Sequence, residues 1–159
     1  MRVIKDREVI EDSWQRLADE QPLIDGDVII SYRRWQEQGE DIAAHQGGLA
    51  ICIDGDDDIG EVAAIADRFP MIAVDFPSFK DGRCYSQARL LRERHGYQGE
   101  IRALGDVLRD QLLYMSRCGI DAFVVREDRD AEDALKAFGE LKVRYQAGAD
   151  GEGPIYRYR

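Results

Sequence analysis

The sequence has little cysteine and histidine and no long hydrophobic run. It contains three cysteines, Cys52, Cys84 and Cys118, and two histidines in 159 residues. No two cysteines have the C-x-x-C spacing, which leaves a zinc ribbon or a thioredoxin-like redox site without support. No apolar run approaches the ~20 residues of a membrane-spanning helix, and the first residues lack the apolar stretch of a signal peptide. We therefore expect a soluble, cytoplasmic protein.

Positive charge is also scarce. The chain has 22 Lys and Arg residues against 32 Asp and Glu residues, which gives a formal net charge of −10. Because nucleic acids and anionic lipid surfaces repel such a chain, we expect neither a nucleic-acid partner nor a membrane partner. Hydrophobic residues make up 44% and charged residues 34% of the 159 residues, a globular balance in a length typical of one domain. We expect a single domain over 1–159.

Several familiar catalytic motifs are missing as well. The sequence has no G-x-S-x-G, H-E-x-x-H, G-x-G-x-x-G or P-loop pattern, so hydrolase, zinc-protease, Rossmann dehydrogenase and nucleotidase functions have no support. The acidic run 54–58 does not form an EF-hand, because the sixth and twelfth positions from Asp54 hold Ile59 and Ile65 instead of Gly and Glu. Residue chemistry alone names no substrate, no cofactor and no catalytic residue.

What the sequence does contain is a repeated βα pattern. Short apolar runs at 49–53, 71–76, 100–104 and 121–125 start at intervals of about 20 to 30 residues and alternate with helical patterns. Their continuous hydrophobicity is typical of strands covered on both faces. We predict an α/β fold of four consecutive parallel βα units, arranged as a half-barrel or an open parallel sheet. A half-barrel leaves an exposed apolar edge that favours a homodimer, unless N-terminal strands cover it.

Helical periodicity follows each of these runs. Helices are expected from Asp57 or Asp58 to Phe69, from Tyr85 or Ser86 to Gly96, from Asp106 to Gly119 and from Ala131 to Tyr145. Residues 1–46 are predicted to form a short N-terminal β segment with turns and a connection, and 47–146 to form the βα core. Residues 147–159 are rich in Gly and charge and are predicted to be a mobile tail.

Acidic residues follow each predicted core strand. Ligands of parallel α/β proteins bind beyond the carboxyl ends of the strands, and those ends carry Asp54, Asp75, Asp106 and the run 126–128. Such a ring of carboxylates suits Mg²⁺, which prefers hard oxygen ligands. Asp is also a common helix cap and turn residue, and caps explain the pattern more simply.

The loop after the second core strand is the most informative. It carries two aromatic residues, Phe76 and Phe79, and the turn Lys80-Asp81-Gly82-Arg83 directly before a helix. Two cations beside a helix N-terminus predict an anion site, with the aromatic rings as an exposed apolar wall. We assign to this site Asp75, Phe76, Phe79, Lys80, Asp81 and Arg83. The alternative is an ordinary surface loop with a glycine turn.

Asp106 and Arg109 extend this site to the next βα unit. Asp106 is predicted to cap the helix that follows it. An arginine near a helix start opposes the helix dipole, so Arg109 either faces a bound anion or forms a salt bridge with Asp106 or Asp110. The sequence favours neither explanation. If adjacent loops converge, Lys80, Arg83 and Arg109 approach one ligand.

Three segments of the chain resemble an uncharacterised bacterial family. They are 74–86 (VDFPSFKDGRCYS), 88–92 (ARLLR) and 105–111 (GDVLRDQ). Members of that family are commonly encoded beside assimilatory sulfite reductase and are described as oxidoreductases of sulfite reduction. Position 84 is often Gly in the family, which argues against a catalytic thiol at Cys84.

The resemblance implies a role in assimilatory sulfate and sulfite reduction, and so in cysteine biosynthesis. Because the chain lacks the cysteines for an iron–sulfur and sirohaem centre, we expect an accessory protein that supports or binds sulfite reductase or another protein of sulfate assimilation. The anions of that pathway fit the predicted cationic face. The alternative is a small enzyme on a half-barrel scaffold that uses the carboxylate ring, with or without Mg²⁺.

Overall fold

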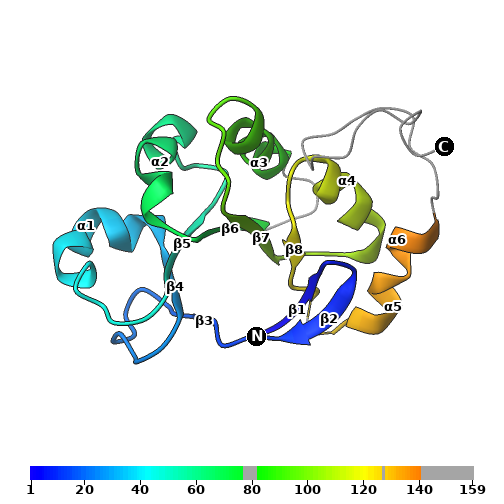
Figure 1. Ribbon diagram of the computed structural model, residues 1–159, viewed down its shortest axis with the longest axis horizontal. Helices are drawn as coiled ribbons and strands as arrows, with labels where there is room; N and C mark the ends of the chain where they lie inside the picture. The colour runs from blue at the N-terminus through cyan, green and yellow to red at the C-terminus, as the bar shows by residue number, and fades with distance from the viewer. Residues whose placement is uncertain (77–81, 127, 141–159) are drawn as a thin grey trace.

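The protein folds around one curled, mostly parallel sheet of eight strands (Figure 1). The computed structural model describes residues 1–76, 82–126 and 128–140. The strands are β1 (Arg2–Lys5), β2 (Glu8–Glu11), β3 (Gln15–Arg16), β4 (Val28–Ser31), β5 (Leu49–Ile53), β6 (Met71–Phe76), β7 (Glu100–Gly105) and β8 (Ala122–Phe123). Their order across the sheet is β2-β1-β8-β7-β6-β5-β4-β3. The sheet curls into a half-barrel, and the α/β fold predicted from the sequence is confirmed.

The helices lie between the strands along the chain. They are α1 (Tyr32–Ile42), α2 (Ile59–Ile65), α3 (Arg83–Glu93), α4 (Leu112–Arg117), α5 (Ala131–Leu135) and α6 (Ala137–Glu140), with short 3-10 helices η1 (Ala66–Arg68) and η2 (Arg109–Gln111). In Figure 1 the helices α1 to α4 follow the outer, convex side of the sheet. The concave side therefore faces the N-terminal segment.

The parallel core matches its prediction closely. Strands β5, β6 and β7 begin where the apolar runs begin, and β5 to β8 are all parallel neighbours. The last strand is shorter than expected, since only residues 122–123 of the run 121–125 are in β8. The predicted helix 131–145 is interrupted at Lys136, between α5 and α6, and its end lies outside the described residues, as do 147–159.

The N-terminal segment differs from its prediction in one respect. The hairpin β1–β2 pairs antiparallel with β8, as a short β segment would. However, β4 joins β5 in parallel and is followed by α1, so the chain contains a βα unit before residue 47. Ser31 caps α1, because its hydroxyl accepts a hydrogen bond from the backbone N–H of Arg34. Burial of Tyr32, Trp35 and Ile42 holds this otherwise polar helix on the sheet.

The segment after β7 also differs from its prediction. A helix starting at Asp106 was expected, but the chain forms a loop and then η2, and α4 starts only at Leu112. Gly105 has a φ of +87°, a conformation that favours glycine, and it turns the chain sharply at the end of β7. The prediction that Asp106 caps the helix is therefore wrong.

Two apolar layers cover the two faces of the sheet. The larger one lies between the sheet and the outer helices and includes Val74, Phe76, Leu91 and Met115. The smaller one lines the concave face and consists of Ile29, Ala50, Cys52, Met71, Ala73 and Leu104, with Met1, Trp14 and Val124 packed against it. Because both faces are covered, the core strands are apolar at consecutive positions.

The two edges of the sheet are neighbours in sequence. The edge strands β2 and β3 are joined by residues 12–14 alone, and the chain from Glu11 to Gln15 spans at most about 15 Å. We call 12–14 the strap. In the described part of the chain neither β5 nor β8 is an edge, because β4 and β1 cover them. The exposed apolar edge expected of a half-barrel is thus covered, and the homodimer stays a prediction.

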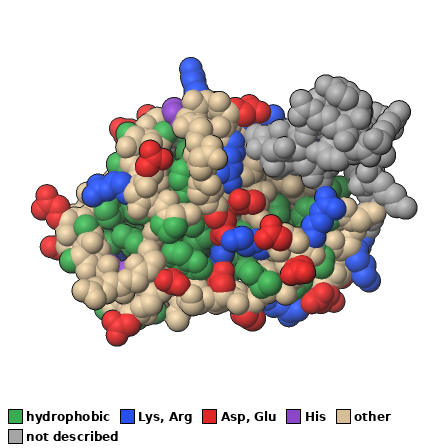
Figure 2. All heavy atoms as spheres, in the orientation of Figure 1, with side chains coloured by type: hydrophobic (Ala, Val, Ile, Leu, Met, Phe, Trp, Pro, Cys, Tyr) green, Lys and Arg blue, Asp and Glu red, His purple; other side chains and the backbone are tan. Residues whose placement is uncertain are grey.

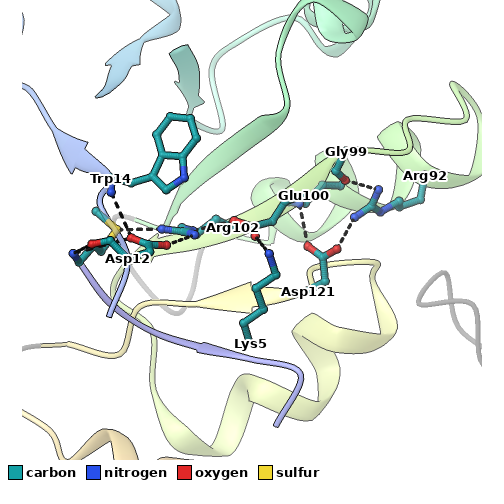
Figure 3. Close-up of polar contacts among 10 residues, drawn as sticks. Lys5, Asp12, Trp14, Arg92, Gly99, Glu100, Arg102 and Asp121 are labelled. Carbon is teal, nitrogen blue, oxygen red and sulfur yellow. Dashed lines mark hydrogen bonds and ion pairs between the residues drawn. The ribbon is translucent and has the colours of Figure 1, made fainter. Parts of the chain in front are cut away.

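A buried arginine fixes the strap to the sheet (Figure 3). Arg102 lies in β7 and is only 1% exposed. Its guanidinium donates to Asp12 in the strap at 2.5 Å and to Glu100 at 2.8 Å, and Glu100 also binds Lys5 of β1 at 2.6 Å. The network connects the N-terminal hairpin, the strap and β7.

Candidate functional site

A pocket of about 530 Å³ opens at the carboxyl ends of β4, β5 and β6. This is the end of a parallel sheet at which ligands usually bind. We call it the mouth pocket. Its polar lining residues include Arg16, Asp19, Ser31, Arg33, Cys52, Asp54, Asp57 and Asp75.

Arg16 is the cation at the base of the mouth pocket. It lies in β3, where pairing of Gln15 and Arg16 with β4 fixes the backbone. One terminal nitrogen donates to Asp75 at 2.8 Å, and the two side chains are 44% and 28% exposed. Burial acts to lower the pKa of Arg16, but Cys52 and Asp75 outweigh it and the net shift is upward. The guanidinium is therefore charged and accessible.

Cys52 lines the same pocket as a neutral thiol. It is 7% exposed, and its polar contact is a long one of 3.9 Å to the carbonyl of Ile53. Burial raises the pKa of Cys52 to about 12, although Arg16 acts in the opposite direction. A thiol that is protonated at neutral pH is a poor nucleophile and a weak hydrogen-bond partner.

Three carboxylates complete the lining. The hydroxyl of Ser31 donates to Asp19 at 2.6 Å, Asp54 accepts from the N–H of Asp56 at 2.8 Å, and Asp57 accepts from the N–H of Asp54 at 2.9 Å. None of these three acids forms an ion pair with a cation in the described ranges. Burial raises the pKa of Asp57, and the charges of Asp54 and Asp56 add to that rise.

The loop that carries these acids is fixed by α3. Gln87, almost fully buried, donates from its amide nitrogen to the carbonyls of Asp54 at 2.6 Å and Asp57 at 3.0 Å. Its amide oxygen has no partner among the described residues. The wall formed by 54–57 is thus held by side-chain bonds from a neighbouring helix.

Of the residues assigned to the anion site, Asp75 lines the mouth pocket. Phe79, Lys80 and Asp81 lie outside the described residues. Arg83 starts α3 instead of ending a loop, and it binds Asp56 at 2.6 Å. Arg109 binds Asp133 of α5 at 3.5 Å, a partner that the sequence did not indicate. The convergence of Lys80, Arg83 and Arg109 stays a prediction.

The expectation that Phe76 is exposed is wrong. Phe76 is fully buried and packs against Tyr85 with ring centroids 5.0 Å apart, so it cannot form an exposed wall. Cys84 is also fully buried, since α3 begins early enough to turn it toward the carbonyl of Asp75 at 3.2 Å. Both side chains are buried because they lie on the inward faces of β6 and α3. Basic side chains are dispersed among acidic ones over the face in Figure 2.

The carboxylate ring is not assembled as a metal site in the described part of the chain. Asp75 binds Arg16, and Asp106 binds Arg126 at 2.9 Å. Arg126 also binds Asp128 at 2.8 Å. No group of three His, Cys, Asp or Glu side chains in 1–76, 82–126 and 128–140 could hold a metal ion. Arginines thus separate the acids that Mg²⁺ would need together.

Prediction from the sequence missed Arg16, Asp19 and Ser31. Arg16 lies in a two-residue strand between polar residues, with no periodicity around it. Ser31 has the character of a helix cap, which is a local signal, but helix α1 was itself not expected. What brings these residues to Asp75 is the pairing of β3 with β4, a contact that no sequence pattern indicates.

Fold and pocket together define an α/β protein with a polar pocket at the carboxyl ends of the strands of a curled, mostly parallel sheet. The chain belongs to the family described as "Bacterial protein of unknown function (DUF934)", whose model matches residues 50–156. No curated protein and no solved structure matches the chain. Among the helices of the described residues, none has the length and apolar character needed to span a bilayer.

Proposed function

We propose that this protein is an accessory protein of assimilatory sulfite reduction that binds a small oxyanion in the mouth pocket. The observation that carries the binding role is Arg16, a charged guanidinium at the strand carboxyl ends that is 44% exposed. Within the described residues, its other two nitrogens have no hydrogen-bond partner. The resemblance of segments 74–86 and 105–111 to a family encoded beside sulfite reductase supports the pathway.

An oxyanion suits this arginine chemically. A guanidinium presents its donors in a planar fork that matches two oxygens of a sulfite, sulfate or phosphate group. Asp75 holds the guanidinium from one side, which fixes its orientation before a ligand arrives. The neutral thiol of Cys52 adds polarizable surface without adding charge.

Binding fits these residues better than catalysis. The thiol in the pocket is protonated at neutral pH, and the strand-end acids Asp75 and Asp106 are occupied by arginines. We therefore favour an accessory role, with sulfite reductase or another protein of sulfate assimilation as the partner, over a Mg²⁺-dependent enzyme.

The binding role is tested by calorimetric titration with sulfite, sulfate and phosphate. Arg16→Met, which keeps the length of the side chain and removes its charge, should weaken binding by about tenfold or more. Arg2→Met is the matched control, because Arg2 is an exposed arginine of β1 paired loosely with Glu132 at 3.7 Å. Equal affinities of Arg16→Met and the unchanged protein would exclude Arg16 as the anion ligand.

The pathway is tested separately by growth. A deletion strain should fail on sulfate and sulfite and grow on sulfide and cysteine, and the unchanged gene should restore growth. Arg16→Met should not restore growth, whereas Arg2→Met should. Normal growth of the deletion strain on sulfate would refute the role in sulfite reduction, and a pull-down without sulfite reductase would refute that partner.

A further inference from the structure

The mouth pocket carries an excess of acidic groups beside the cation Arg16. Four carboxylates and two guanidinium groups line it in the described part of the chain, so the lining is net negative. Arg16 is paired with Asp75, and Arg33 is paired with Glu37 on the outer surface at 3.1 Å. Asp19, Asp54 and Asp57 line the same pocket and form no ion pair with any cation of the described residues. An acidic group can bind Arg16, and these acids are then left for a basic group of the same ligand.

We infer that the ligand of the mouth pocket is a small zwitterion, with an acidic group for Arg16 and an ammonium group for the acids opposite it. The inference rests on the proposed binding role and specifies its ligand class. An ammonium group is a compact cation with three donors. Three carboxylates with unused acceptor positions are its natural partners, since charge-assisted hydrogen bonds are the strong ones.

Both kinds of charge lie within electrostatic reach of one point. Arg16 lowers the pKa of the Cys52 thiol, while Asp75, Asp54 and Asp57 raise it. The thiol is thus surrounded by the cation and by the acids, and a ligand of a few heavy atoms lying over it can contact both. The pocket, at about 530 Å³, has room for such a molecule.

Cys52 supplies an independent reason to expect a ligand here. It lines the pocket while more than nine-tenths buried, and its polar contact is a 3.9 Å approach to the adjacent carbonyl. A short carbon chain between the two charged ends of a zwitterion would pack against this soft, uncharged sulfur. The neutral sulfur of Cys52 and the opposed charges therefore both favour a short molecule with one charge at each end.

Titration with four probes of matched shape tests the inference. Taurine and β-alanine carry both charges, ethanesulfonate carries only the acid, and ethylammonium carries only the base. Taurine or β-alanine should bind at least about tenfold more tightly than either single-charge probe, which is ~1.4 kcal/mol. Asp57→Asn and Asp19→Asn, which keep an acceptor oxygen, should remove most of that preference. Asp25→Asn, a change at an exposed acid outside the pocket, should not.

The outcomes separate the inference from the proposed binding role. If ethanesulfonate and sulfite bind as tightly as taurine, and only Arg16→Met weakens them, the zwitterion is refuted and the anion site stands. If ethylammonium equals taurine and Arg16→Met has no effect, both fail. A zwitterion preference that Asp57→Asn and Asp25→Asn reduce equally would also overturn the inference.

Discussion

Removal of the Arg102 charge should destabilise the protein strongly. Arg102 is 1% exposed and binds Asp12 at 2.5 Å and Glu100 at 2.8 Å. Arg102→Met keeps much of the volume but removes the cation closest to Asp12, which is only 20% exposed and keeps the longer contact of 3.7 Å to the N-terminal ammonium of Met1. Breaking a buried ion pair by removing one partner costs ~3–5 kcal/mol. Because Glu100 keeps Lys5 at 2.6 Å, we expect the lower part of that range.

Urea unfolding measures the loss. The urea concentration at the midpoint of unfolding should fall. The dependence of the free energy of unfolding on urea concentration should stay constant, since the surface exposed on unfolding is unchanged. The melting temperature should fall by about 2–4 °C for each kcal/mol in a chain of this length. The double change Arg102→Met with Asp12→Asn should recover part of the loss, because a neutral amide then replaces the carboxylate that has lost Arg102.

The control is an ion pair between an arginine and a carboxylate at the protein surface. Arg33 binds Glu37 at 3.1 Å with side chains 77% and 57% exposed, so Arg33→Met should cost only ~0–1 kcal/mol. If Arg102→Met costs no more than Arg33→Met, or if the double change recovers nothing, then the network does not fix the strap and the reasoning is refuted.

Two further predictions concern the pH dependence of stability and the substitution of two glycines. Burial raises the pKa of Tyr85 to about 12, so its contribution to stability is fully present below about pH 10 and is lost as the pH rises through 12. Burial also raises the pKa of Tyr97 and of Cys52, so melting curves of Tyr85→Phe should show a smaller alkaline loss than the unchanged protein. Tyr114→Phe, at a 51% exposed position, should show the full loss. Gly105→Ala should cost more than ~1–2 kcal/mol, because φ is +87° and a Cβ would meet the Asp75 carboxylate and lie 2.6 Å from the Phe76 carbonyl. It should also weaken anion binding in calorimetry by displacing Asp75 from Arg16. Gly82→Ala should be neutral or slightly stabilising, because φ is an ordinary −74° and no atom of the described residues lies within 4 Å of the added Cβ. Equal losses for both glycine variants would contradict this expectation.

The predictable part of the fold is the part with a local signal. The runs beginning at Leu49, Met71 and Glu100 are continuous hydrophobic stretches with helical patterns between them, and each forms the expected strand. Helix α1 was missed because its sequence is polar, includes Gly39 and bends at Gln38, so that burial by the sheet rather than periodicity stabilises it. Tertiary packing commonly outweighs local propensity in this way.

The candidate site also has one part with a local sequence signal and one part without it. Asp75 was predicted because it ends a recognisable strand, and it does line the pocket. Arg16, its partner 59 positions away, was not predicted because the two meet only through the pairing of β3 with β4. Phe76 looked exposed beside a polar loop, yet the alternation of β6 turns it into the outer core.

The pairing of β1 with β8 has a consequence for the order of events during synthesis. Ile4 lies opposite Phe123, so the hairpin β1–β2 finds its place in the sheet only after β8 has left the ribosome. Contacts between such distant parts of a sequence form slowly, because a long loop must close before they give any stability. Strands β4 to β7 have neighbours that are close in sequence and can pair earlier. The N-terminal hairpin is therefore anchored after the strands β4 to β7, and so is the strap that leads from it to Arg16.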